Sequence, residues 1–142
     1  MEERETRAGP CILIVDDEAS VLTMFRAVLE SEGYTVTTAS SAVEARKKLT
    51  AGKYDLVATD IRMETETAGF DVVRAARRRP EAPAILLLTA YPISEPQWRE
   101  AGAHAGFMKG MPIEQLVELI QRLLAARAER AADRAQERRS GT

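Results

Sequence analysis

Five polar side chains fall at or near the ends of short apolar runs, and their types could together carry chemistry. They are Asp16 and Asp17 after CILIV, Asp60 after LVAT, Thr89 after AILLL, and Lys109 after AGFM. Carboxylates that lie close together repel unless a cation offsets them, and Mg²⁺ is typically held by one or two carboxylates with water and phosphate. An ammonium and a hydroxyl add charge neutralisation and a hydrogen bond for a phosphoryl group. The set therefore predicts phosphoryl transfer, in which an aspartate can itself be the nucleophile.

The elements along the chain decide whether these five residues meet. Apolar runs typical of buried strands cover 11–17, 34–39, 55–60, 84–90 and 105–109. Helical spacing with capping and breaking residues covers 18–33, 41–52, 69–79, 94–102 and 112–127. Strand and helix alternate, so we expect an α/β fold with a doubly wound, five-stranded parallel sheet of the flavodoxin-like type.

In such a sheet all carboxyl ends of the strands lie along one edge. With strand order 2-1-3-4-5 the first and third strands are neighbours at the point where the order reverses, and ligands bind there. Asp16, Asp17 and Asp60 then converge at this point. Acidic residues therefore end buried strands because that edge of the sheet is the predicted site of reaction. Ala90 is small and leaves room beside Thr89.

Composition excludes several classes of protein. The chain has 142 residues, 45% of them hydrophobic, and 20 basic against 22 acidic residues give a net charge of −2. This predicts one folded domain without the basic footprint of a nucleic-acid binder. No apolar run is long enough for a transmembrane helix, the charged N-terminus lacks a secretory signal, and one cysteine cannot form an internal disulfide. We expect a cytoplasmic protein.

The matching motifs resemble the receiver domain of bacterial two-component response regulators. They are the DD pair at 16–17, DIRM with Asp60, LLTAY with Thr89, and GFMKGMP with Lys109. Each motif alone is weak, but together they lie on four strands in the right order. The resemblance covers about residues 11–126, so we expect 1–9 to be a disordered tail and 10–127 the receiver domain.

The resemblance implies a role for each matched residue. Asp60 accepts a phosphoryl group from a phosphohistidine of a sensor histidine kinase or phosphotransfer protein. Asp16, Asp17, Asp60 and the backbone carbonyl of Arg62 hold Mg²⁺. Thr89, Ala90 and Lys109 bind the phosphoryl group.

The resemblance also implies an output. Thr89 and Phe107 act as the switch, which repacks the face formed by 94–102, 105–109 and 112–127 for a downstream protein partner or a homodimer. No membrane contact and no enzyme activity beyond the domain's own phosphoryl transfer and slow dephosphorylation are expected.

Departures from the family pattern lie around this core. The loop METETAGF has no proline and is one residue longer than usual, and Pro112 lies three residues after Lys109. The segment from Thr89 to Lys109 is about two residues short, and Phe107 lies two residues before Lys109, where the family's aromatic lies three before. Arg62 and Tyr91 lie where the family's hydrolytic water passes, which predicts slow autodephosphorylation.

Two alternatives come from other classes of protein. An acid phosphatase also forms an aspartyl phosphate, but it needs a second aspartate at position 62, where this chain has Arg62. A pseudo-receiver binds partners without phosphate, and the altered loops keep this alternative open.

Four features have no role in the receiver chemistry. Residues 128–142, rich in Ala and Arg, are either a frayed end or an extension of the last helix that serves as a partner surface or linker. They are too few for an output domain, so we expect partner binding, phosphate relay, or one module of a longer protein. His104 lies in the turn before the last strand. Trp98 either packs in part or faces a partner, and Arg77–Arg79 are interpreted as a solvated helix end.

Overall fold

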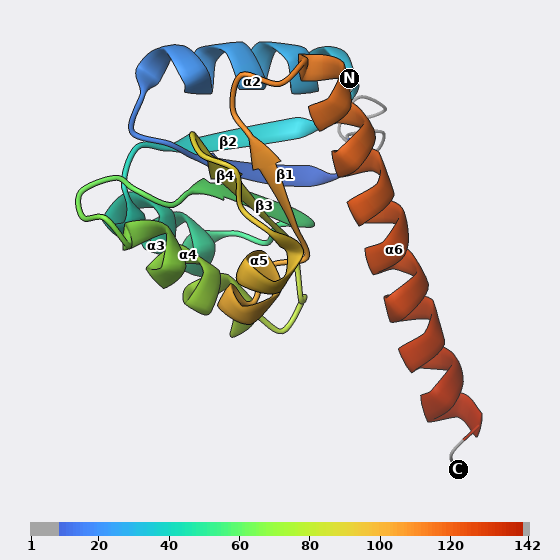
Figure 1. The fold of residues 1–142 in the computed structure, drawn as a ribbon. Coiled ribbons are helices and arrows are strands. Elements are labelled where there is room, and N and C mark those ends of the chain that lie inside the picture. The colour runs from blue at the N-terminus through green and yellow to red at the C-terminus, as the bar shows by residue number, and fades with distance from the viewer. Residues whose placement is uncertain (1–8, 141–142) are drawn as a thin grey trace.

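The computed structural model describes residues 9–140, which form one parallel sheet with helices on both faces (Figure 1). The strands are β1 (Cys11–Val15), β2 (Thr35–Ala39), β3 (Leu56–Asp60), β4 (Ala84–Thr89) and β5 (Ala105–Met108). The helices are α2 (Ala19–Ser31), α3 (Ala42–Ala51), α4 (Ala68–Arg77), α5 (Glu95–Ala101) and α6 (Ile113–Ser140). The strand order is β2-β1-β3-β4-β5. The predicted fold class and strand order are confirmed, and most elements end within two residues of the predicted bounds, as is usual for such limits.

The central strands are apolar without interruption because each of their faces packs against a layer of helices. Along β1, Leu13 and Val15 face one core with α3 and α4, whereas Ile12 and Ile14 face another core with α2 and α6. All of these side chains are fully buried. Alternate side chains point to opposite faces of a strand, so a strand covered on both sides needs apolar residues at every position.

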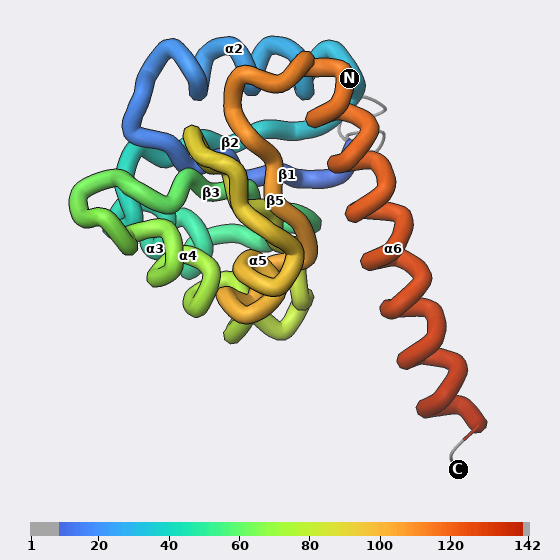
Figure 2. Tube along the Cα trace, viewed as in Figure 1, coloured from blue at the N-terminus to red at the C-terminus, as the bar shows by residue number. Residues whose placement is uncertain are grey.

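The last helix continues well past the bounds 112–127 that its core-facing stripe predicts. Of the two alternatives for the segment that follows, a frayed end or a helical extension, the structure shows the extension, since α6 continues to Ser140 and has 28 residues. Figures 1 and 2 show its last turns leaving the body of the domain. Residues 128–140 add roughly 20 Å of helix at 1.5 Å per residue. The predicted disordered tail 1–9 falls almost wholly on residues 1–8, outside the described part of the chain.

Arg127 attaches α6 to the amino end of the sheet. Its guanidinium donates to Asp55 Oδ1 at 2.8 Å, to the Glu81 carbonyl at 2.8 Å and to the Ala82 carbonyl at 3.1 Å. The other carboxylate oxygen of Asp55 accepts from the backbone N–H of Cys11 at 2.8 Å. One arginine therefore joins the last helix to β1, to the start of β3 and to the loop before β4.

Gly69, the second residue of α4, lies against the backbone at the end of β3. Its N–H donates to the Ile61 carbonyl at 2.8 Å. A Cβ atom at this position would lie 2.0 Å from the carbonyl oxygen of Asp60. Only glycine lets the helix approach the strand this closely. The contact places the N-terminus of α4 beside Asp60, the last residue of β3.

We expect Gly69→Ala to lower the free energy of unfolding by about 2 kcal/mol or more, because overpacking against backbone cannot relax as a side-chain contact can. Urea denaturation followed by circular dichroism measures this loss. Gly52→Ala is the matched control, because its new Cβ would meet only the Tyr54 side chain at an ordinary 3.5 Å. Equal stability of the two variants would contradict this account.

Candidate functional site

The predicted polar residues gather at the carboxyl edge of the sheet because of the strand register. Val15 of β1 pairs with Thr59 of β3, so the next residues along each strand, Asp16 and Asp60, lie side by side. Asp60 in turn pairs with Leu88 of β4, which brings Thr89 to the same edge. The carboxyl edge of an open parallel sheet is where such folds bind ligands.

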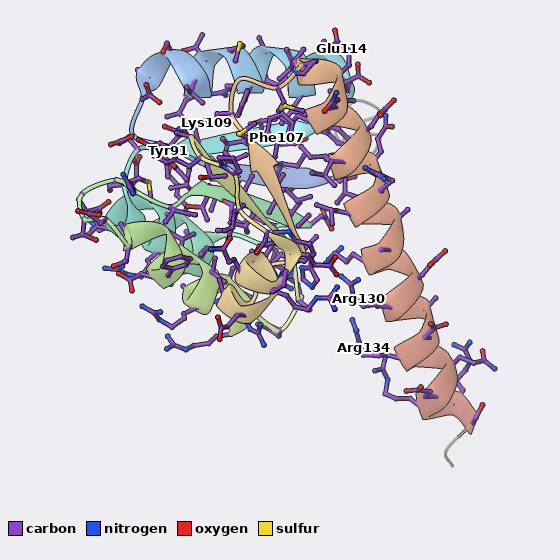
Figure 3. All side chains as sticks on the ribbon, in the orientation of Figure 1. Tyr91, Phe107, Lys109, Glu114, Arg130 and Arg134 are labelled. Carbon is purple, nitrogen blue, oxygen red and sulfur yellow. The ribbon has the colours of Figure 1, made fainter. Side chains whose placement is uncertain are left out.

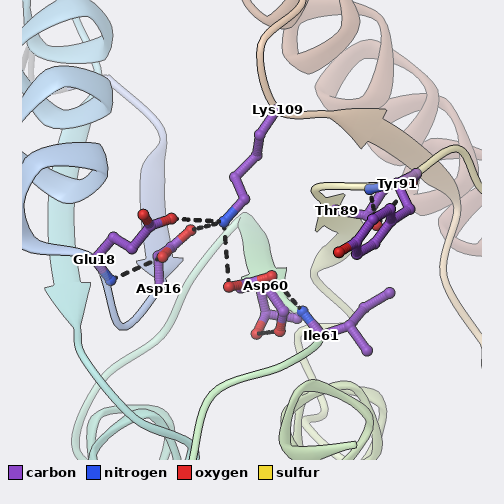
Figure 4. Close-up of polar contacts among 8 residues, drawn as sticks. Asp16, Glu18, Asp60, Ile61, Thr89, Tyr91 and Lys109 are labelled. Carbon is purple, nitrogen blue, oxygen red and sulfur yellow. Dashed lines mark hydrogen bonds and ion pairs between the residues drawn. The ribbon is translucent and has the colours of Figure 1, made fainter. Parts of the chain in front are cut away.

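Lys109 joins the carboxylates of this edge (Figure 4). Its ammonium lies 2.9 Å from Asp16 Oδ2, 3.2 Å from Asp60 Oδ2 and 3.3 Å from Glu18 Oε1. Asp16 is fully buried and its side chain also accepts from the Glu18 N–H at 2.9 Å. The contact with Glu18 was not predicted, because this residue reaches Lys109 only through the turn that Asp16 forms after β1.

Asp60 is held at both carboxylate oxygens. Oδ2 meets Lys109, and Oδ1 accepts from the Ile61 N–H at 2.8 Å. Burial raises the pKa of Asp60 above its usual value, the nearby charge of Asp16 raises it further, and Lys109 opposes both effects. Burial alone would lower the pKa of Lys109, but its contacts with Asp16 and Asp60 raise it instead, so the ammonium stays charged.

The carboxylates fit a divalent cation. Asp16, Asp17 and Asp60 each offer an oxygen, and these oxygens lie within 4.8 Å of one another. Asp17 is exposed, so water can complete the coordination. An all-oxygen set of carboxylates beside open solvent suits Mg²⁺, which keeps several waters when it binds. The site also needs further positive charge, because among residues 9–140 Lys109 is the one ammonium beside Asp16, Asp60 and Glu18, and Asp17 adds a fourth carboxylate.

The Thr89 hydroxyl is not directed at Asp60 in this structure. It donates to the Tyr91 carbonyl at 2.8 Å and accepts from the Tyr91 N–H at 3.0 Å. Ala90 is exposed between these two residues and lines the cavity above the carboxylates, which measures about 600 Å³. The hydroxyl is therefore close to the site, but both of its hydrogen bonds are with the backbone of its own loop. These bonds with Tyr91 were not predicted.

Arg62 and Tyr91 lie against each other at the mouth of this cavity. The guanidinium carbon lies 5.1 Å from the centre of the Tyr91 ring, a distance typical of a cation–π contact. Both residues line the cavity together with Asp60 and Lys109. The contact joins the loop after β3 to the loop after β4 across this cavity.

Phe107 is buried on the face of the sheet that packs against α2 and α6. Gly106, its neighbour along β5, lies on the opposite face, where a Cβ atom would come within 3.0 Å of Ile93 and Trp98. Figure 3 shows Phe107 with Lys109 and Tyr91 in one view. Trp98 packs in part against this face of the sheet, beside Gly106 of β5, which agrees with the first of its two interpretations. A role in partner binding stays a prediction.

Glu64 organises the long loop after Asp60, and sequence reasoning missed it. Its two carboxylate oxygens accept from the N–H groups of Ala42 and Val43 at 3.0 and 3.2 Å, so it caps α3 from 22 residues away. Burial by itself would raise its pKa, but these hydrogen bonds and the charge of Arg46 lower it below its usual value. Glu64 thus ties the loop after β3 to the start of α3.

The fold and its acidic edge define a doubly wound α/β protein that works at the carboxyl ends of its strands. The chain matches the family model of the response regulator receiver domain over residues 12–121, and it belongs to that family. A receiver domain is a phosphoacceptor signalling module of two-component systems rather than a catalytic enzyme.

Two curated relatives are regulators of transcription. The chain is 42% identical over 93 residues to the alginate biosynthesis transcriptional regulatory protein AlgB of Pseudomonas aeruginosa, a match that covers 64% of this chain and 20% of that protein. It is 33% identical over 124 residues to the DNA-binding transcriptional regulator NtrC of Rhizobium meliloti, with 82% and 24% covered. The chain thus spans only a small part of these relatives.

Two solved structures show the same fold. A CheY-like receiver domain protein of Methanospirillum hungatei has a TM-score of 0.76 at 30% identity, with 85% of this chain and 98% of that one covered. The response regulator TrrA of Thermotoga maritima, solved in complex with Mg²⁺-BeF, has a TM-score of 0.72 at 33% identity, with 81% and 99% covered. Among residues 9–140, no helix is long and apolar enough to cross a membrane.

We expect Mg²⁺ at ten times its dissociation constant to stabilise the fold by about 1.4 kcal/mol, because it binds only the assembled cluster. Differential scanning fluorimetry would then show a rise of about 5 °C in the unfolding midpoint. Asp17→Asn should abolish most of this rise, because it removes one ligand that is exposed and not needed for folding.

Asp133→Asn is the matched control, because it makes the same charge change at an exposed position on α6, outside the cluster. It should keep the full response to Mg²⁺. A response that is the same in both variants would mean that the ion acts by general screening and does not bind at the carboxylate cluster.

Proposed function

We propose that Asp60 accepts a phosphoryl group from the phosphohistidine of a sensor histidine kinase or phosphotransfer protein, with Mg²⁺ held by Asp16, Asp17, Asp60 and the Arg62 carbonyl. The observation that carries this proposal is the contact of one ammonium, on Lys109, with Asp16 and Asp60 at the carboxyl edge. The Mg²⁺-BeF complex of TrrA supports the cation and the phosphoryl-like group in a relative of the same fold.

The side chains of the site can position this transfer. An Asp60 oxygen forms the new bond to phosphorus while the bond from the histidine nitrogen breaks, and the histidine keeps that electron pair. Lys109 and the Ile61 N–H keep the Asp60 carboxylate in one orientation. Mg²⁺, when bound, supplies positive charge for the phosphoryl oxygens. The reaction needs positioning and charge neutralisation more than covalent chemistry from the protein.

Thr89 and the face around β5 supply the switch in this proposal. The Thr89 hydroxyl leaves the Tyr91 backbone for a phosphoryl oxygen, which frees the loop after β4. That loop adjoins a cavity of about 600 Å³ lined by residues of β5, α6 and the loop, among them Ile93, Gly106, Phe107 and Leu119. Movement of the loop therefore changes the surface that α5, β5 and α6 offer to a downstream protein or a second copy.

The boundaries and setting of the module belong to the same proposal. Residues 10–127 form the receiver unit, a span supported by the family match over 12–121 and by the Arg127 contacts at its end. Residues 128–142 lie outside this unit. The protein works in the cytoplasm with protein partners, and this segment of chain does not itself bind nucleic acid.

Acetyl phosphate with Mg²⁺ should add one phosphoryl group to the protein, and Asp60→Asn should abolish the labelling completely. The amide has the same shape but cannot form the acyl phosphate. Intact-mass spectrometry measures the added group. Beryllofluoride, a phosphoryl mimic, should change the fluorescence of Trp98, which packs against β5 near the cavity.

Circular dichroism of Asp60→Asn is the control for folding, and light scattering during beryllofluoride binding reports a homodimer. A folded wild-type protein that takes up neither the phosphoryl group nor beryllofluoride would overturn the proposal and leave the phosphate-independent pseudo-receiver as the function.

The aspartyl phosphate should persist with a half-life on the order of hours, because the Arg62 and Tyr91 side chains cover the approach of water. Removing either side chain, by Arg62→Ala or Tyr91→Ala, should shorten the half-life by about tenfold. Release of inorganic phosphate after removal of acetyl phosphate measures the rate.

Arg74→Ala is the control for loss of an exposed arginine, since Arg74 pairs with Asp71 on α4, outside the cavity. It should leave the half-life unchanged. A wild-type half-life of seconds, or no effect of the two alanine variants, would show that these side chains do not restrict water.

A further inference from the structure

A second polar cavity lies at the amino end of the sheet, on the opposite edge from Asp60. It measures about 200 Å³ and is lined by Arg77 of α4, His104 before β5 and Arg130 of α6, with Gly102 and Ile85. Three elements that are far apart in sequence thus each contribute a nitrogen-bearing side chain. Nothing in the receiver chemistry uses these residues.

Backbone hydrogen bonds hold His104 in one orientation and one tautomer. The backbone N–H of His104 donates to the Ile85 carbonyl at 2.8 Å, and the ring atom Nδ1 accepts from the backbone N–H of Ile85 at 3.0 Å. Because Nδ1 accepts, the imidazole hydrogen of the neutral ring is on Nε2. No acceptor among residues 9–140 takes that hydrogen, so the ring presents a free donor while it is neutral.

The two arginines bring positive charge to this cavity. One N–H group of the Arg77 guanidinium donates a hydrogen bond to the Gly102 carbonyl at 3.3 Å, which leaves the remaining N–H groups available. Figure 3 shows Arg130 extending from α6 toward the body of the domain. Arg130 is half-buried, although it lies beyond the residues expected to form the compact domain.

Arg77 and Arg130 have no counter-charge in the described part of the chain, in contrast to three other arginines of the same region. Arg74, Arg99 and Arg127 each form an ion pair with a carboxylate. Within residues 9–140, no carboxylate lies within ion-pair distance of Arg77 or Arg130, and none lines the cavity. Partial burial, then the charges of Arg130 and Arg77, lower the pKa of His104, so the local field is positive.

We propose that Arg77, His104 and Arg130 form a binding site for a phosphate-class oxyanion, either free phosphate or the phosphate group of a small phosphomonoester. Guanidinium groups match the oxygens of such an anion in geometry, and the neutral imidazole adds a third donor. The cavity holds one tetrahedral oxyanion with water but is below the usual size of a drug-like ligand site.

An anion here has a structural consequence that is independent of phosphorylation at Asp60. It bridges α4 and the start of β5 to the part of α6 that follows Arg127. Without the anion, the last ion pair between α6 and the body of the domain is that of Arg127 with Asp55. The bound anion therefore adds one turn of α6 to the folded body.

NMR of the imidazole of His104 tests the site directly, because this is the only histidine in the chain. Inorganic phosphate is titrated into metal-free protein at constant ionic strength kept with chloride. We expect a saturable shift of the imidazole signals and an upward move of the His104 pKa, since a nearby anion favours the charged ring. Glycerol 3-phosphate in a second titration distinguishes a phosphomonoester from free phosphate by the tighter binding.

Arg130→Gln and Arg77→Gln should each weaken binding about tenfold, as expected for loss of one charge-assisted hydrogen bond. Arg138→Gln is the matched control on the exposed end of α6 and should bind as the wild type does. A linear response without saturation, or saturable binding that all three variants keep, would overturn the proposal. Saturation in the wild type and the control with loss in the two site variants would establish it.

Discussion

The contact of Lys109 with three acidic side chains is the interaction on which the functional edge depends. The parallel register places Asp16 beside Asp60, and both are buried, so their charges repel in a setting with little water. One ammonium within 3.3 Å of Asp16, Asp60 and Glu18 offsets part of that repulsion. The remaining negative charge is what makes the edge attractive to a divalent cation, and through the cation to a phosphoryl group.

The loops around this edge are arranged to hold the site and to limit access to it. Glu64 fixes the loop after β3 by capping α3, and Gly69 brings α4 against the backbone of Asp60. On the other side the Tyr91 backbone occupies the Thr89 hydroxyl. In the proposed switch, a phosphoryl group competes for this hydroxyl and changes the loop next to the β5 surface, which would link local charge to the surface offered to partners.

The opposite edge of the sheet has the reverse electrostatic character. There Arg127 is paired with Asp55, whereas Arg77 and Arg130 converge on His104 without a carboxylate. The first turns of α6 are held in the core by Leu116 and Ile120, and the helix passes both of these charged features as it leaves the body. The two edges thus give one small domain an acidic cluster suited to Mg²⁺ and a proposed site for an oxyanion.

Much of the fold followed from local pattern. Buried strands such as LVATD and AILLLT are continuous apolar runs because helices cover both faces, and the polar residues that end them mark the carboxyl edge. Parallel topology alone then brings Asp16, Asp17, Asp60, Thr89 and Lys109 together, so the acidic cluster and its suitability for Mg²⁺ could be predicted from residue types and order.

The tertiary structure alone decided which partners these side chains choose. Neither Glu64 reaching across to α3, nor the Thr89 hydroxyl turned to the Tyr91 backbone, nor the meeting of Arg77, His104 and Arg130 has a local signal. Such contacts depend on rotamers and on distances between elements that are remote in sequence. A run of residues specifies its own helix or strand, whereas a contact across the fold exists only after the sheet and both helical layers have been assembled.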